Sequence, residues 1–82
     1  MLEDMADLEF RFQPRWKEEL VCECDLGSLV LDLTMGVPTV YLPNVQAWVS
    51  FAPDWAIPHW QTLHDQLQAW CSSQNIPLQL SE

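Results

Sequence analysis

Apolar residues recur with the spacing of an α-helix between Trp55 and Asn75. The positions that share this face are Ile57, Trp60, Leu63, His64, Leu67, Trp70 and Cys71. The opposite face is polar and weakly charged. The spacing predicts one long helix over 58–73, with Trp60, Leu63, Leu67 and Trp70 buried.

Shorter stretches alternate apolar and polar residues with a period of two, which is the pattern of a half-buried strand. Alternation or a high content of β-forming residues predicts strands at 8–12, 19–25, 29–35, 39–42 and 46–51, and a short last strand at 77–80. Pro14 is expected to end the first of them. In the second, Leu20, Cys22 and Cys24 should point inward.

Turn and cap residues separate these elements. Gly27 suits a positive φ in the turn between the second and third strands. Asp54 is expected to cap a short turn through Ile57, and Pro58 fits the first turn of the main helix. Asn75 can take the left-handed position at the end of that helix.

The order of these elements defines the fold class. Strands followed by a helix predict an α+β fold: an antiparallel meander of about five strands, with one long helix packed on one face and a short C-terminal strand. The 82 residues predict a single domain over 1–82. Residues 1–6 would form a flexible N-terminal extension, and Met5 is an alternative start.

Charge sets the chain apart from most small domains. Twelve acidic residues against three basic ones give a net charge of −9. Such a field opposes binding to nucleic acid and to anionic membranes, which need Lys and Arg. It favours a basic protein partner, or it serves solubility alone.

The acidic residues predict a binding face. Glu19, Glu23 and Asp25 should share one outward side of a strand, with Asp32 outward on the next strand. Like charges on adjacent strands cost stability, so we expect a cationic partner or ample solvent there. Residues of the N-terminal segment would add to the same side: Glu3, Asp4, Asp7 and Glu9.

Two tryptophans lie at the junction formed by Ser50 to Ile57, Trp48 just before it and Trp55 within it. If Trp48 and Trp55 are exposed, they would anchor a partner, because Trp is common at interface hot spots. The alternative, which we favour, is that both wedge the start of the helix against the end of the sheet.

The cysteines number three, and Cys22 and Cys24 lie too far apart on a strand for an unstrained disulfide. We expect free, buried thiols and a reducing, cytoplasmic compartment. A metal site built from Cys22, Cys24, His64 and Cys71 is conceivable if the helix covers the hairpin. The spacing lacks two close ligand pairs, however, so we expect no metal and no cofactor.

No motif indicates catalysis. The two glycines stand alone in turns, so no phosphate-binding loop is present, and no Ser, Cys or Thr lies in a nucleophile elbow. The acidic N-terminus lacks the pattern of a secretory signal, and no apolar run reaches about 18 residues. We therefore expect neither an enzyme nor a membrane protein.

Small size and acidity make the chain similar in kind to small inhibitory proteins, such as the immunity proteins that neutralise basic bacterial toxins. That likeness implies a protein that masks a basic surface of its partner, as monomer or homodimer. The alternative is a structural or self-associating domain whose acidity serves solubility. A third class is a small metal- or ligand-binding module.

Overall fold

The computed structural model describes residues 8–15, 18–34 and 36–81. It has an α+β fold with one five-stranded sheet in the order β1-β2-β3-β4-β5. The strands are β1 (Arg11–Arg15), β2 (Glu19–Cys24), β3 (Gly27–Thr34), β4 (Thr39–Pro43) and β5 (Leu78–Ser81). The helices are α1 (Val45–Phe51), the 3₁₀ helix η2 (Asp54–His59) and α2 (Trp60–Gln74).

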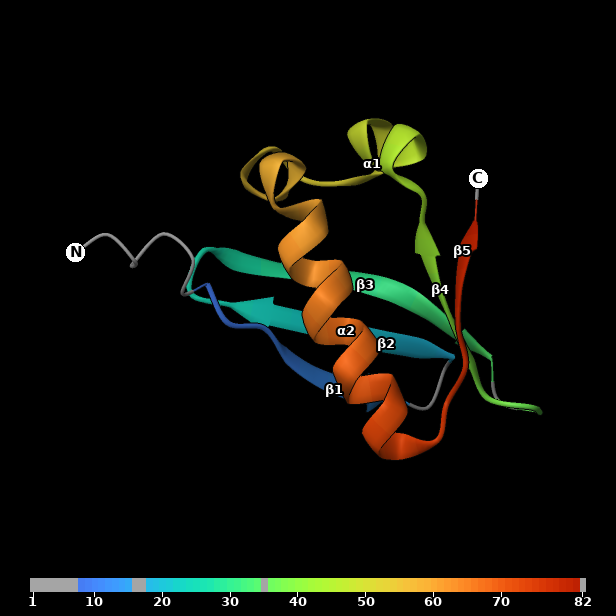
Figure 1. The fold of residues 1–82 in the computed structure, drawn as a ribbon. Helices are drawn as coiled ribbons and strands as arrows, with labels where there is room; N and C mark the ends of the chain where they lie inside the picture. The colour runs from blue at the N-terminus through green and yellow to red at the C-terminus, as the bar shows by residue number, and fades with distance from the viewer. Residues whose placement is uncertain (1–7, 16–17, 35, 82) are drawn as a thin grey trace.

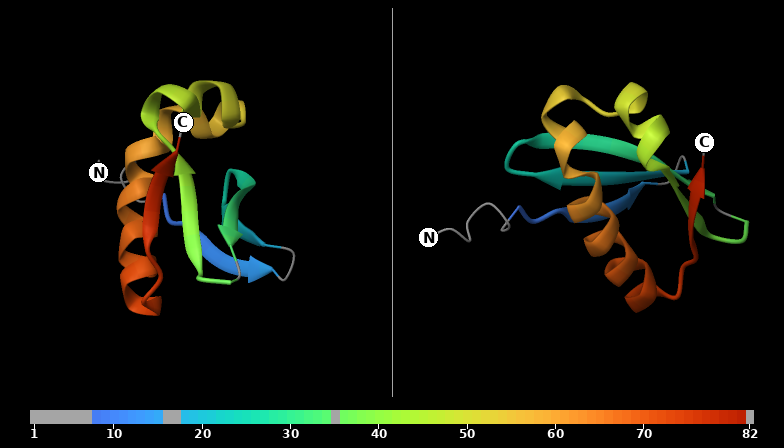
Figure 2. Two further views of the ribbon diagram at one scale, coloured as in Figure 1. Left: turned by 90° about the vertical axis from the view of Figure 1, so that its right-hand side faces the viewer. Right: turned by 45° about the horizontal axis from the view of Figure 1, so that its top comes forward.

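The sheet is mixed. The first four strands form the predicted antiparallel meander, and β5 pairs with β4 in parallel. A parallel pair needs a long crossover, which α1, η2 and α2 supply. Figure 2 shows α2 along one face of the sheet, while α1 and η2 lie across one end of it. The predicted extension at 1–6, which includes Glu3 and Asp4, lies outside the described residues, and so does Asp7.

The core lies between α2 and the sheet. Leu63, Leu67 and Cys71 are the buried residues of α2. The inward positions of β2 are buried as predicted, and those of β3 are buried with them: Leu20, Cys22, Cys24, Leu29, Leu31 and Leu33. Trp60 and Trp70 are only half-buried, because they lie at the margins of the helix face. Their full burial was therefore a wrong prediction.

The segment predicted as a strand at 46–51 is a helix. The side chain of Asn44 accepts a hydrogen bond from the Ala47 N–H at 2.8 Å, which caps the first turn of α1. The helix then buries Trp48, whose indole N–H donates to the Ala56 carbonyl at 3.0 Å. A period of two and a period of 3.6 are hard to separate over so short an apolar stretch.

Two proline predictions were also wrong. Pro14 lies inside β1 instead of ending it, and an edge strand tolerates this because a missing donor costs nothing on its free side. Pro58 lies in η2, ahead of α2. Asp54 begins η2 without capping it, because no side-chain cap bond forms there.

Both predicted left-handed or positive-φ positions are confirmed. Asn75 has φ 58°, and its N–H bonds to the carbonyls of Cys71 and Ser72 at the end of α2. Gly27 has φ 153°, and a Cβ there would lie 2.7 Å from the indole nitrogen of Trp55. Trp55 therefore packs directly on the β2–β3 turn, and only glycine leaves room for it.

Candidate protein-binding surface

The face of the sheet opposite α2 carries the predicted acidic residues. Within the described ranges no helix or strand covers this open face, and its side chains reach solvent from every strand. Strand alternation that buries Leu20 and Cys22 turns Glu19 and Glu23 outward on β2, and Asp32 outward on β3. Glu23 and Asp32 are exposed and Glu19 is half-buried.

The register aligns outward residues into rows across the strands. One row runs through Arg15, Glu19, Asp32, Tyr41 and Gln79. Arg15 forms an ion pair with Glu19, with 2.8 Å between its Nη2 and the carboxylate Oε1. Glu19 thus lies between a cation and the carboxylate of Asp32, whereas Asp32 has Tyr41 on its other side.

The neighbouring rows carry less net charge. Val21 lies opposite Val30, which is 38% exposed, and forms an apolar centre with it. Glu23 lies opposite Arg11 on the edge strand. Two of the three basic residues therefore lie beside the predicted acidic face, which the sequence pattern did not reveal. Glu19 and Glu23 each lie directly opposite an arginine of β1. Asp32, in contrast, lies opposite Glu19 and Tyr41 and has no arginine directly opposite it.

Two shallow hollows flank Asp32 and Tyr41. One, of about 210 Å³, is lined by Val30, Leu31, Asp32, Tyr41, Pro43, Phe51 and Ser81. The other, of about 270 Å³, is lined by Glu18, Asp32, Leu33, Thr34 and Tyr41. Asp32 and Tyr41 belong to both, so an acidic and an aromatic residue lie between the two hollows.

Glu18 lines the second hollow from a strained backbone position. Its φ is 62°, in the left-handed region that non-glycine residues rarely adopt. The Glu18 carbonyl accepts a hydrogen bond from the Leu33 N–H at 3.0 Å, which continues the β2–β3 ladder by one residue. Glu18 and Asp32 both line this hollow, so two acidic residues border it. Strained residues of this kind are enriched at functional sites.

The remaining predicted site residues lie elsewhere. Asp25 is exposed in the β2–β3 turn, outside the rows of the strands. Trp48 is 1% exposed and hydrogen-bonded within the core, so it does not meet the condition for a partner anchor and packs inside, as the favoured alternative predicted. Trp55 is half-buried, with its ring 6.4 Å from that of Phe10 and its indole against Gly27. Trp55 therefore serves packing, as the favoured alternative predicted.

Sequence reasoning missed Tyr41, Phe51 and Glu18 as surface residues of this site. Tyr41 carried a usable signal, because it alternates with the inward Val40 and Leu42. Phe51 reaches the hollow only because its segment is a helix. Glu18 gave no signal, because the sequence pattern does not show that its backbone takes a left-handed conformation.

The cysteines are buried and unpaired, as predicted. Burial, together with the nearby Cys71 thiol, raises the pKa of Cys22 to about 12, and burial also raises the pKa of Cys71. Both thiols are thus neutral near pH 7 and unreactive as nucleophiles. Among the described residues no group of three or more His, Cys, Asp or Glu side chains is placed to hold a metal ion.

Comparison of the chain with protein-family models, with curated proteins and with solved structures finds no match in any of the three. Across the described part of the chain, no helix is both long and apolar enough to cross a membrane. The residues themselves are therefore the basis for any functional assignment.

Proposed function

We propose that this domain is a non-enzymatic protein-binding module that masks a basic region of a partner on the open face of its sheet. The observation that carries the proposal is the position of Asp32. It lies directly opposite Glu19 in the register, borders Tyr41, and stands between the two hollows. A lysine or arginine of the partner would enter one hollow beside the Asp32 carboxylate.

The energetics of the face favour a cation. Two carboxylates on directly opposite positions repel each other, and a partner's positive charge removes that repulsion. The rings of Tyr41 and Phe51 line the first hollow and offer aromatic faces to a guanidinium or ammonium group. The exposed Val30 supplies apolar contact at the centre. Arg11 and Arg15 lie on the edge strand, so the cation-accepting part is centred on β3 and β4.

The net charge of −9 supports fast association with such a partner, because long-range attraction mainly raises encounter rates. We place the function in the cytoplasm, since three unpaired thiols fit a reducing compartment. The absence of a catalytic role is part of the proposal: the two thiols with raised pKa values are neutral, and the acids near Asp32 are open to solvent.

The test is a comparison of two double charge reversals in affinity capture followed by binding kinetics. Glu18→Lys with Asp32→Lys alters the open face, and Asp54→Lys with Asp65→Lys makes the same change of net charge on η2 and α2. Glu23 is left unchanged, because a lysine there would face Arg11. We expect the first variant to slow association of a captured basic protein about tenfold more than the second.

Equal effects of the two reversals on the association rate would overturn the open-face proposal, since only net charge would then matter. Circular dichroism and unfolding curves of both variants check that the fold is retained. Increased salt should weaken binding by the native protein more than binding by the open-face variant, because screening removes an attraction that the variant already lacks.

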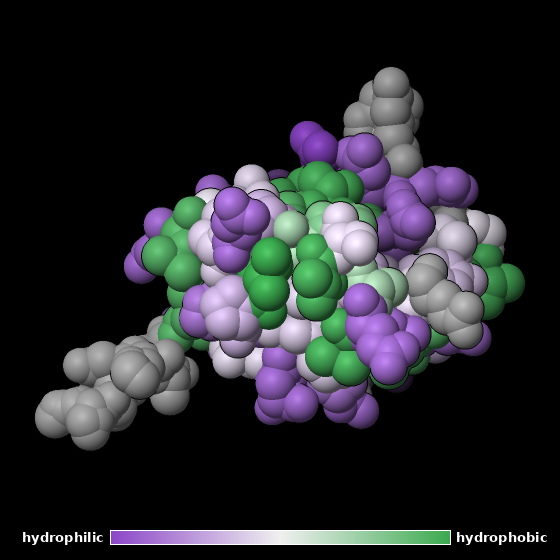
Figure 3. Space-filling view, turned by 90° about the horizontal axis from the view of Figure 1, so that it is seen from above, coloured by the Kyte–Doolittle hydropathy of each residue, from purple (hydrophilic) through white to green (hydrophobic). Residues whose placement is uncertain are grey.

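A second candidate function, self-association, is favoured by exposed apolar residues on α1. Val45, Val49 and Phe51 are 57%, 61% and 46% exposed. Figure 3 looks onto the end of the molecule that carries α1 and η2, and it shows green apolar side chains among purple polar ones. Sedimentation at low and high salt tests this candidate: a dimer that persists in high salt and is lost in a Val45→Lys, Val49→Lys variant would support it.

A further inference from the structure

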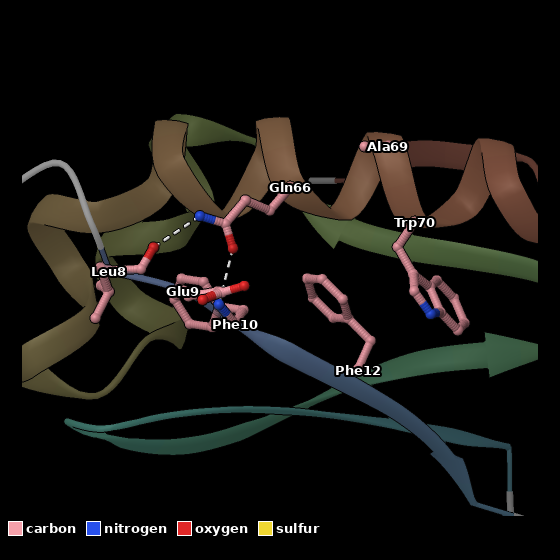
Figure 4. A pocket seen from close by; sticks show the side chains of 7 residues that line it. All are labelled: Leu8, Glu9, Phe10, Phe12, Gln66, Ala69 and Trp70. Atoms are coloured by element: carbon pink, nitrogen blue, oxygen red, sulfur yellow. Dashed lines mark hydrogen bonds between the residues drawn. The ribbon is translucent and has the colours of Figure 1, made fainter.

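A groove runs along the free edge of β1, beneath α2, away from the two hollows of the open face. It has a volume of about 690 Å³. Its lining residues come from the start of the described chain and from α2: Leu8, Glu9, Phe10, Phe12, Gln66, Ala69 and Trp70. Figure 4 shows Phe12 and Trp70 side by side in the groove, with the Gln66 amide over the backbone near Phe10.

Gln66 pairs with this edge as a neighbouring strand would. Its side-chain Nε2 donates to the Leu8 carbonyl at 2.7 Å, and its Oε1 accepts from the Phe10 N–H at 2.8 Å. One amide therefore satisfies an acceptor and a donor on the edge that β2 does not reach. The geometry shows that an amide supplied from the helix side fits the edge.

Among the described residues, the next position along the edge that has no strand partner is Phe12. The bond from Leu33 N–H to the Glu18 carbonyl makes the even-numbered residues of β2 face β3 and the odd-numbered ones face β1. The β1 partners of those odd residues are Arg11, Gln13 and Arg15. By alternation, the N–H and C=O of Phe12 point away from β2, as the N–H of Phe10 does.

The free edge is short. Gln66 occupies the positions at Leu8 and Phe10, and Pro14 has no N–H to donate. As far as residues 8–15 and the rest of the described chain show, the edge thus offers one residue, Phe12, with both a donor and an acceptor. In an antiparallel pair, the residue directly opposite Phe12 would put its side chain on the same face as the Phe12 ring. That face is the groove beneath α2.

We propose that the groove is a second binding site, which takes an extended segment of a partner protein paired antiparallel with Phe12 and inserts one lysine or arginine side chain between β1 and α2. The site uses edge-strand addition, in which backbone hydrogen bonds supply affinity and a side-chain pocket supplies specificity. The groove shares no lining residue with the hollows around Asp32. The groove proposal is therefore independent of the proposed function.

The chemistry of the lining selects a cation. The rings of Phe12 and Trp70 lie 5.7 Å apart at 44° and are both half-buried, so part of each ring is open to the groove. Glu9 is the one charged residue among the seven lining residues, all of which belong to the described part of the chain. An aliphatic stem would lie on the aromatic rings, with its charged end towards the Glu9 carboxylate.

Capped pentapeptides serve as the probe: Thr-Val-Arg-Val-Thr, the same peptide with central Glu, and the Arg peptide with a methyl group on the central backbone nitrogen. Binding is followed by two-dimensional NMR of the whole chain. The Arg peptide should shift the Phe12 amide and the Trp70 indole signals. The Glu peptide should bind about tenfold more weakly, and the N-methyl peptide about three- to tenfold more weakly through one lost hydrogen bond.

Two neighbouring lysine substitutions on α2 provide the matched control. Ala69 is exposed and lines the groove, whereas Gln68 is exposed and does not line it. At about 0.15 M salt, Ala69→Lys should weaken Arg-peptide binding about tenfold and Gln68→Lys by less than about twofold. If both substitutions weakened Arg-peptide binding equally, the change in net charge alone would explain the loss, and the groove proposal would be wrong.

Two further outcomes would overturn the groove site: peptide-induced shifts at Asp32 and Tyr41 in place of Phe12 and Trp70, and equal affinity of the N-methylated peptide. The Glu18→Lys, Asp32→Lys variant separates the two sites. It should keep its affinity for the Arg peptide within about twofold while losing the partner of the open face, because the altered residues lie outside the groove.

Discussion

Glu19 and Asp32 occupy directly opposite positions on β2 and β3, so that two acidic residues are neighbours on the open face of the sheet. Arg15 holds Glu19 by an ion pair on its other side, while Asp32 faces Tyr41. The like-charge pair weakens the isolated domain, and it marks the place where a cationic group from outside would be most favourable.

Neutralising Asp32 should stabilise the free domain. Asp32→Asn removes the repulsion with Glu19, so we expect the free energy of unfolding to rise by about 0.2–1 kcal/mol in urea denaturation at low salt. The control is Asp65→Asn, which makes the same charge change on α2 and weakens a hydrogen bond from Gln61. A gain as large for Asp65→Asn would show that the net charge, and not the opposed pair, is responsible.

Gly27 should resist replacement. In Gly27→Ala the new Cβ would lie 2.7 Å from the indole nitrogen of Trp55, at a φ that alanine rarely adopts. We expect a loss of about 1–3 kcal/mol in the free energy of unfolding, with a change in tryptophan fluorescence. The only other glycine, Gly36, has no atom within 4 Å of an added Cβ, so Gly36→Ala should be neutral or gain about 0.4–1 kcal/mol. Similar losses at both glycines would contradict the packing of Trp55 on the turn.

Leu67 should be one of the most costly positions on α2. It is fully buried against the sheet, so Leu67→Ala removes apolar burial and leaves a cavity. We expect a loss of about 2–5 kcal/mol by urea denaturation. Gln68→Ala, at the exposed neighbouring position, should change stability by less than about 0.5 kcal/mol. A loss of that small size at Leu67 would mean that α2 packs on the sheet through another face.

Burial of the Cys22 thiol should make stability fall in alkaline solution. Its pKa is raised from 9.0 to about 12 by burial and by the Cys71 thiol. Between these two values the unfolded chain loses the thiol proton while the folded chain keeps it. The unfolded state therefore binds fewer protons, and the free energy of unfolding should drop by about 1.4 kcal/mol per pH unit for this group.

Urea denaturation at about pH 8 and about pH 10.5 measures this alkaline loss. Cys22→Ala should lower the free energy of unfolding at both pH values. The drop in that free energy from about pH 8 to about pH 10.5 should be smaller than in the native protein, because the Cys71 thiol, whose pKa burial also raises, remains. An identical pH dependence in the two proteins would refute the role of Cys22. All three thiols should also react slowly with a thiol reagent unless denaturant is added, since all three are buried.

Local patterns in the sequence determined the central hairpin and the main helix. The alternation from Leu20 to Leu33 and the helical spacing of Leu63 and Leu67 each place apolar side chains on one face of a single element. Asn75 and Gly27 were predictable for a similar reason, because their conformations depend on the residue type at one position. The outward direction of Glu23 and Asp32 followed from the same alternation.

Tertiary structure decided which residues of other elements lie against the faces of these strands and helices. The register of β1 on β2 brought Arg11 and Arg15 opposite Glu23 and Glu19, and the crossover made β5 parallel to β4. Helix α1 formed where alternation suggested a strand at 46–51, since its Asn44 cap and the burial of Trp48 against η2 outweigh so short a pattern. Strand pairing and side-chain burial join residues far apart in the chain, so no local period specifies them.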